Sequence, residues 1–190
     1  MRVPSLHCSK KPAIPFPEFM TTRLTKTRKK KSAGILCLGK FPLKKKKIVL
    51  AVGDNKKRKE HFEKFSKNIF PENIIHPSAV IEKRSATGKA NLFFAGSVVN
   101  AEAKIGDNNI INTRAVIEHE VVIGNHNHIS VGTILCGRVG IENVCFIGAG
   151  TVVIDKIRIC SHVIVGANSV IVKDITEPGI YAGNPARKIK

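Results

Sequence analysis

Large apolar residues recur at every sixth position along the second half of the chain. The series begins at Ile75 and ends at Ile171, and Thr87 is its one member that is not large and apolar. An α-helix repeats apolar positions about every 3.6 residues and a half-buried strand every second residue, so neither element produces this period. The series is Ile75, Ile81, Thr87, Phe93, Val99, Ile105, Ile111, Ile117, Ile123, Ile129, Leu135, Ile141, Ile147, Val153, Ile159, Val165 and Ile171.

A strict period of six predicts an all-β fold, a parallel β-helix with a triangular cross-section. Each hexapeptide forms one flat side and points its large residue at the axis, so three of them make one coil of 18 residues. The series accounts for nearly six coils, stacked at roughly 4.8 Å. Gly106, Gly124, Gly148 and Gly166 follow the inward residue, and we expect them to supply a permissive backbone for turns. Small residues are expected at the corners: Ala79, Ser85, Ser97, Ala103, Ala115, Thr133, Cys145, Thr151 and Ser169.

A short β-α unit is predicted ahead of the repeats. Residues 48–53 (IVLAVG) indicate a buried strand that ends in a turn at Gly53-Asp54-Asn55. Residues 56–68 indicate a helix in which Phe62, Phe65 and Ile69 share one face. This unit is too small to form a domain by itself.

Residues 1–46 differ from the rest of the chain in composition. Most of the excess positive charge lies within residues 1–60. Residues 1–60 contain 18 Lys and Arg against three acidic residues, whereas residues 61–190 contain 14 against 11. We expect residues 1–46 to be disordered or foreign to the fold, with a strand candidate at 34–38; the alternative is a nucleic-acid-binding arm or a localisation signal. The nearly neutral remainder argues against nucleic-acid binding by the main domain.

Cysteine usage and hydropathy bear on the compartment. The five cysteines show no CxxC spacing, and an odd count without a signal peptide fits a reducing cytosol. No apolar run reaches the roughly 18 residues that a membrane span requires. We therefore expect a cytoplasmic protein that does not enter a membrane.

The densest cluster of polar residues that could carry chemistry lies between residues 118 and 128. His119 next to Glu120 offers a general base and a carboxylate that orients it, as acyl transfer from a thioester requires. Gly137 lies 18 residues after His119, hence one coil further along the same side, and its unshielded N–H could bind the developing oxyanion. The alternative without a catalytic role is that His119 is an ordinary surface histidine.

A metal site is a weaker interpretation of the histidines. His126 and His162 are 36 residues apart, or two coils, which separates them by roughly 10 Å and is too far for one ion within a chain. The His-x4-His pair of the zinc hydratases that share this fold is missing. We expect no metal, and we interpret Cys136, Cys145 and Cys160 as small packing residues.

The segment 110–120 (IINTRAVIEHE) resembles the signature of the sialic-acid O-acetyltransferase NeuD-like family, hexapeptide-repeat acyltransferases that include PglD-like enzymes. The resemblance continues through 124–132 (GNHNHISVG) and 183–187 (GNPAR) and covers about residues 47–190. It implies a left-handed coil, a homotrimer and acetyl-CoA as co-substrate. It also implies an acceptor that is a nucleotide-linked amino sugar or a sialic acid.

The resemblance also implies roles for individual residues. By position, His119 is the general base and Glu120 raises its basicity. Asn112 lies near the acceptor, and His128 contacts acetyl-CoA. Backbone groups of Ala149 and Ala167 contact the coenzyme in a groove between subunits.

The chain departs from the family in its N-terminal part. Family members begin with a strand and a Gly-x-Gly-Gly-His turn that binds the sugar nucleotide, and this turn is missing here. Residues 47–70 resemble only the later part of that domain, in which Gly53 is the remaining candidate for contact with the acceptor. We expect 47–70 to be a remnant of the sugar-nucleotide-binding domain and 75–190 to be the acyltransferase domain.

The sequence thus predicts an acetyl-CoA-dependent acetyltransferase that acts on a sugar amine or hydroxyl in surface-glycan synthesis. The same base serves both nucleophiles, so N- and O-acetylation stay open. A catalytically weak β-helix that acts as a scaffold or binds a partner is the alternative from another class.

Overall fold

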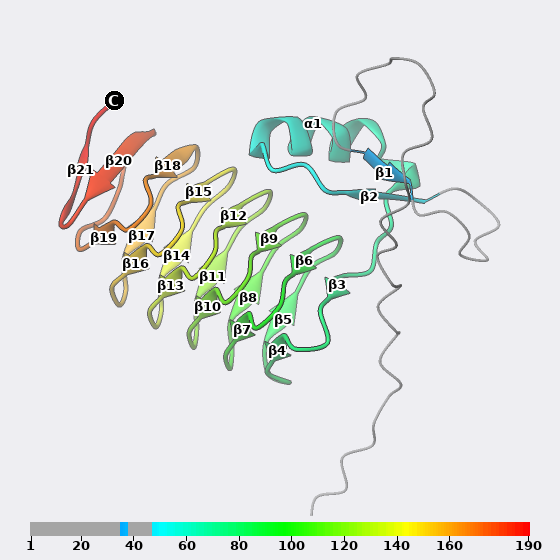
Figure 1. Cartoon of the computed structure of the whole chain (residues 1–190), viewed down its shortest axis with the longest axis horizontal. Coiled ribbons are helices and arrows are strands. Elements are labelled where there is room, and N and C mark those ends of the chain that lie inside the picture. Colours follow the sequence, from blue (N-terminus) through cyan, green and yellow to red (C-terminus); the bar gives the residue numbers. More distant parts are fainter. Residues whose placement is uncertain (1–34, 38–46) are drawn as a thin grey trace, which may run out of the picture.

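The computed structural model describes residues 35–37 and 47–190, and Figure 1 shows most of them wound into a β-solenoid of three parallel sheets. Sheet I contains β3 (Ile74–Ile75), β6 (Leu92–Phe93), β9 (Ile110–Ile111), β12 (His128–Ile129), β15 (Phe146–Ile147), β18 (Val163–Val165) and the closing hairpin of β20 (Gly179–Gly183) and β21 (Ala186–Lys188). Sheet II contains β4 (Val80–Ile81), β7 (Val98–Val99), β10 (Val116–Ile117), β13 (Ile134–Leu135), β16 (Val152–Val153) and β19 (Val170–Ile171). Sheet III contains β5 (Ala86–Thr87), β8 (Lys104–Ile105), β11 (Val122–Ile123), β14 (Gly140–Ile141) and β17 (Arg158–Ile159).

Three corners join the sheets, and each is named here for one residue. The Asn112 corner (residues 112–115) leads from sheet I to sheet II, the His119 corner (118–121) from sheet II to sheet III, and the His126 corner (124–127) from sheet III back to sheet I. Each corner includes the equivalent residues of the other coils, 18 positions away in either direction, because the strands pair in that register.

The predicted inward series forms the core from Phe93 onward, whereas Ile75 and Thr87 in the first coils are exposed. Ile111, Ile117, Ile129 and Leu135 are fully buried, and the series packs as one continuous cluster from Phe93 to Ile171. The small corner residues Ala103, Ala115, Thr133 and Cys145, among others, are likewise buried. The all-β prediction and its period are therefore confirmed.

The explanation offered for the four glycines is wrong. The left-handed backbone conformation falls two residues later, for example at Asn108, His126 and Asn168 with φ of 55°, 61° and 55°. The glycines are needed because consecutive coils approach closely: a Cβ on Gly124 would lie 2.7 Å from the Glu142 carbonyl oxygen.

The His126 corner contains a ladder of buried asparagines that the period did not predict. The Oδ1 of Asn109 accepts the Asn127 N–H at 2.8 Å, and the Oδ1 of Asn91 accepts the Asn109 N–H at 2.8 Å. The Asn109 Nδ2 also donates to the Gly124 carbonyl at 2.9 Å. These asparagines are 0% exposed and satisfy backbone groups that the turn leaves without strand partners.

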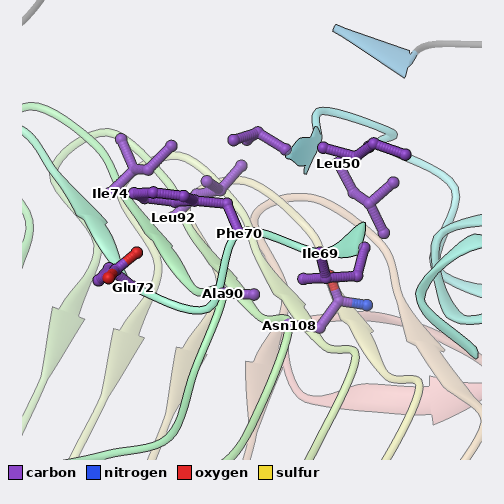
Figure 2. A pocket seen from close by; sticks show the side chains of 10 residues that line it. Leu50, Ile69, Phe70, Glu72, Ile74, Ala90, Leu92 and Asn108 are labelled. Carbon is purple, nitrogen blue, oxygen red and sulfur yellow. The ribbon is translucent and has the colours of Figure 1, made fainter. Parts of the chain in front are cut away.

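The N-terminal unit lies against sheet I and the His126 corner. β2 (Ile48–Leu50) is shorter than the expected strand, and it pairs antiparallel with β1 (Ile35–Cys37), which lies within the strand candidate at 34–38. The other predictions for residues 1–46 concern positions outside the described residues. The packing is close, because the pocket between the unit and the first coils, drawn in Figure 2, has a volume of only about 10 Å³.

The expected helix is divided in two. α1 (Asn55–Lys64) begins after Asp54, which accepts the Lys57 N–H at 2.9 Å, and a 3-10 turn follows at Ser66–Asn68. The break lets Ile69 form a bridge to Ile48 and become buried. Within residues 47–190, no helix has the length and apolar character needed to cross a membrane.

The asparagine ladder yields a stability prediction. Asn109→Ala removes the acceptor of one buried N–H and the donor to one buried carbonyl, so it should lower the free energy of unfolding by about 1–3 kcal/mol per unsatisfied group. Asn125→Ala is the control, because the Asn125 Oδ1 accepts the Asp107 N–H at 2.7 Å, a similar ladder bond in an exposed position. Denaturant unfolding of both variants is the measurement, and equal losses would contradict a special role for the buried ladder.

Candidate active site

The His119 corner holds the candidate base. The His119 Nδ1 lies 3.1 Å from the Glu120 Oε2, and both side chains are about half exposed, at 49% and 48%. If Nδ1 donates to the carboxylate, Nε2 carries the lone pair and is free to accept a proton. The structure therefore brings together the pair expected from the sequence.

Gly137 lies beside the His119 ring, as the 18-residue stacking predicted. A Cβ on Gly137 would lie 2.6 Å from the His119 Cε1 and 2.7 Å from its Nε2, so only a residue without a side chain leaves room for the ring. The Gly137 carbonyl accepts the Lys156 N–H at 3.0 Å, while its own N–H has no acceptor within residues 47–190. An unused N–H next to the base is suited to bind an oxyanion.

Two charged residues that sequence reasoning did not single out flank this pair. The Arg138 Nη2 donates to both carboxylate oxygens of Asp155, at 3.0 and 2.9 Å, and the Arg138 Nη1 lies 3.9 Å from the Glu120 Oε2. The hydrogen bond from Arg138 lowers the pKa of Asp155. Glu120 thus lies between the imidazole of His119 and a guanidinium that Asp155 partly neutralises.

Asn112 and His128 form a second group. His128 lies on β12 of sheet I, and Asn112 lies at the start of the Asn112 corner. The Asn112 Nδ2 is 3.1 Å from the His128 Nε2, and the Asn112 Oδ1 accepts the Thr113 N–H at 2.7 Å. The His128 ring packs edge-on against Phe146 at 5.1 Å between centroids. Burial, followed by the charge of Arg58, lowers the pKa of His128, so this imidazole favours the neutral form.

Gly53 belongs to the N-terminal unit. Its carbonyl lies 3.5 Å from the Arg58 Nη1, and the buried His128 Nδ1 completes no hydrogen bond among the described residues. Arg58, which the sequence analysis missed, anchors the turn at Gly53 and is only 1% exposed. Its position three residues after Asn55 and four before Phe62, on one helical face, was the available signal.

Ala149 and Ala167 follow one another along the Asn112 corner. The Ala149 carbonyl accepts the Asn168 N–H at 2.8 Å, and the Val131 carbonyl accepts the Gly150 N–H at 2.8 Å, so the same position recurs on successive coils. Two coils after Asn112 this corner becomes Gly148-Ala149-Gly150, and one coil further it becomes Gly166-Ala167-Asn168. A narrow corner of this kind exposes the backbone to a long, thin ligand.

The two groups do not meet within one chain. Asn112 and His128 belong to the Asn112 corner and sheet I, whereas His119, Glu120 and Gly137 belong to the His119 corner, and the full width of sheet II separates them. A reaction that uses both groups therefore requires a second copy of the chain.

Metal-binding side chains do not gather anywhere in residues 47–190: no group of three or more His, Cys, Asp or Glu residues is arranged to hold an ion. Cys136, Cys145 and Cys160 are free thiols. Cys145 is fully buried, and burial raises its pKa to about 11, which suits a packing residue.

Solved structures resemble this chain over most of its length. PerB from Caulobacter crescentus, determined with CoA and GDP-perosamine, is 35% identical over 74% of this chain and 68% of PerB, with a TM-score of 0.72. The acetyltransferase domain of PglB from Neisseria gonorrhoeae, determined with acetyl coenzyme A, is 32% identical over 73% of this chain and 68% of that domain, with a TM-score of 0.69. WeeI from Acinetobacter baumannii, at 20% identity and a TM-score of 0.65, shares the fold.

A scan of protein-family models and a search of curated protein sequences each gave no match. The solenoid and the His119 corner define a hexapeptide-repeat acyltransferase. The chain belongs to the family of hexapeptide-repeat sugar N-acetyltransferases that includes PerB and the PglB acetyltransferase domain. The family prediction from the sequence is confirmed.

The fit of His119 against Gly137 generates a prediction. Gly137→Ala should displace the imidazole and lower kcat by about 10²-fold, as expected when a positioned base or oxyanion donor is disturbed. Cys136→Ala, at the neighbouring position, should leave kcat unchanged. Steady-state kinetics with thermal unfolding as a check on folding is the measurement, and a Gly137→Ala enzyme with normal kcat would contradict the placement of the ring.

Proposed function

We propose that this protein transfers the acetyl group of acetyl-CoA to the amine of a nucleotide-linked amino sugar. The observation that carries the proposal is the His119–Glu120 pair over Gly137, in a chain similar to enzymes solved with CoA, acetyl-CoA and GDP-perosamine. This places the activity in glycan synthesis and favours N-acetylation over the O-acetylation of a sialic acid.

The proposed chemistry uses three groups. The His119 Nε2 accepts a proton from the sugar amine as its nitrogen attacks the thioester carbonyl carbon. The Gly137 N–H donates to the oxyanion that forms there. When the tetrahedral intermediate collapses, the carbon–sulfur bond breaks and the proton on His119 passes to the CoA sulfur. Glu120 stabilises the imidazolium between these steps, and the products are the acetamide and CoA.

We assign the coenzyme to the Asn112 corner. The run of glycine and alanine around Ala149 and Ala167 lets a pantetheine arm lie against the backbone, and His128 and Asn112 lie at the end of that run. The acceptor would approach between this corner and the N-terminal unit, next to Gly53.

A homotrimer completes the proposed site. The outward residues of sheet II form an unbroken aliphatic column, Val80, Val98, Val116, Ile134, Val152 and Val170, in direct register. Val80 and Ile134 are exposed and the other four are partly exposed, and a continuous outward aliphatic column of this kind is typical of an interface. Three copies with sheet II facing a common axis would bring the His119 corner of one subunit next to the Asn112 corner of its neighbour.

The cytoplasm is the proposed location. The five cysteines of the sequence show no paired spacing, which fits a reducing compartment.

The direct test is release of CoA from acetyl-CoA with a panel of acceptors that contains GDP-perosamine, other nucleotide-linked amino sugars and free sialic acid. We expect turnover with one or more of the amino sugars, and a His119→Ala variant with kcat lowered by about 10²–10⁴-fold at unchanged acetyl-CoA affinity. Turnover with sialic acid alone would contradict N-acetylation, and no turnover with any acceptor would favour the scaffold alternative.

The sheet II interface gives a matched pair of variants. Ile134 on sheet II and Val122 on sheet III are both outward and similarly exposed, at 39% and 43%. Ile134→Glu should abolish the trimer and the activity, because three carboxylates would be buried near the axis, whereas Val122→Glu should preserve both. Light scattering reports the mass; a trimeric Ile134→Glu protein would contradict the proposed interface.

A further inference from the structure

A network of charged side chains continues from Glu120 along the His119 corner. The Arg138 Nη1 lies 3.9 Å from the Glu120 Oε2, the same oxygen that lies 3.1 Å from the His119 Nδ1. The Arg138 Nη2 donates to both carboxylate oxygens of Asp155, at 3.0 and 2.9 Å. The Lys156 Nζ lies 3.8 Å from the Asp155 Oδ2. Arg138 therefore links the carboxylate of Asp155 to the carboxylate that contacts the candidate base.

The 18-residue register places this network on three successive coils. Arg138 lies one coil after Glu120, and its backbone N–H donates to the His119 carbonyl at 3.0 Å. Asp155 lies one coil after Gly137. A Cβ on Gly137 would lie 2.7 Å from the His119 Nε2 and 3.1 Å from the Asp155 Oδ1. The network thus reaches the space next to the nitrogen that accepts the proton in the proposed reaction.

The Glu120 side chain needs a partner that keeps it against the imidazole. It is 48% exposed, and Glu102 occupies the same position of the corner one coil earlier. Glu102 has a cation of its own, because Arg84 lies 3.7 Å from it. Carboxylates at matching positions of paired strands repel each other, which favours a Glu120 turned away into solvent. Arg138 supplies the opposing attraction from the coil that contains Gly137.

The bond between Arg138 and Asp155 makes this attraction directional. An exposed ion pair contributes little to folding, but a guanidinium bonded to both oxygens of a carboxylate has a fixed orientation. That hydrogen bond lowers the pKa of Asp155, so the carboxylate stays charged at neutral pH. With Nη2 held by Asp155, the Nη1 of Arg138 remains directed at Glu120.

We propose that Arg138 is a positioning residue for acetyl transfer, because it holds the Glu120 carboxylate against the His119 Nδ1. Asp155 orients Arg138 for this task. An ionised carboxylate only accepts hydrogen bonds, so a Glu120 kept in place fixes the proton on Nδ1 and leaves the lone pair on Nε2. The inference rests on the proposed function, which makes His119 the base that takes the proton of the sugar amine.

The simpler interpretation is that Arg138 and Asp155 form an ordinary surface ion pair. Lys156 provides a matched control for it, because its ammonium pairs with the same carboxylate of Asp155 and not with Glu120. Arg138→Gln and Lys156→Gln each remove one positive charge from the same cluster. Only the first should release Glu120, so a difference between the two variants reports positioning and not net charge.

The experiment compares the full chain with its Arg138→Gln, Asp155→Asn and Lys156→Gln variants. Nitrogen-15 spectra of labelled histidine rings report the tautomer of His119, whose signals are identified by their loss in His119→Gln. Steady-state kinetics with acetyl-CoA and GDP-perosamine, or another amino sugar of the panel that is turned over, report KM and kcat. Thermal unfolding checks that each variant is folded.

We expect one Nδ1-protonated form of His119 in the parent protein and in Lys156→Gln, and a mixture of tautomers in Arg138→Gln. The kcat of Arg138→Gln should fall about tenfold, which is less than the about 10²–10⁴-fold loss expected without the base. Its KM for acetyl-CoA should stay within about twofold, because the coenzyme is assigned to the Asn112 corner. Lys156→Gln should keep the parent kcat. Asp155→Asn should lower kcat about threefold, and it replaces Arg138→Gln should that variant fail to fold.

A double-mutant cycle separates positioning from a structural role. If Arg138 acts through Glu120, Arg138→Gln should lower kcat no further in a Glu120→Gln background. Two independent effects would multiply instead.

Four results would overturn the proposal: a single Nδ1-protonated His119 in Arg138→Gln, an unchanged kcat in that variant, an equal loss in Lys156→Gln, or multiplied losses in the double variant. The tautomer spectra require no turnover. If the parent protein transfers no acetyl group but the spectra change as expected, the proposed function fails and the positioning of Glu120 by Arg138 stands.

Discussion

Stacking at 18 residues per coil governs which side chains can meet in this protein. The inward column is buried from Phe93 to Ile171, and neighbouring coils approach so closely that Gly106, Gly124 and Gly148 have no room for a Cβ. A slip of one residue would turn the aliphatic column outward, so the register is strongly specified. The same register places Gly137 over His119 and aligns Ala149 with Ala167.

That constraint also separates the functional groups. A rigid prism cannot fold its Asn112 corner onto its His119 corner, because sheet II lies between them. The outward aliphatic column on sheet II offers a way to bring the two corners together between subunits. The N-terminal unit is held against the solenoid through Arg58, which ties the turn at Val52-Gly53 to the His126 corner.

Much of the fold could be predicted from the sequence because one simple period dominates it. The β-helix, its core series and the relation of His119 to Gly137 all follow from counting residues. The role expected of the corner residues followed from the adjacent His119 and Glu120. The role of the glycines could not be predicted from the sequence. A period indicates where a glycine recurs, but not whether the glycine is needed for its backbone angles or for the short distance between coils.

Contacts between distant segments could not be predicted in this way. Arg58 and Asn55 resemble ordinary polar helix residues until the helix is placed on the solenoid, where both become buried. The asparagine ladder of Asn91, Asn109 and Asn127 also has the 18-residue period, but an asparagine in a turn is as common in solvent as in a buried corner.

The central claim is that the site forms between subunits, with His119 from one and Asn112 from the next. The most direct measurement mixes two inactive variants, His119→Ala and Asn112→Ala, by unfolding and refolding them together. If each site draws on two subunits, random trimers restore both residues at about one interface in four, and acetyl transfer should return to about a quarter of the parent rate. If both residues acted within one chain, the mixed trimers would stay as inactive as the separate variants, which would contradict the account.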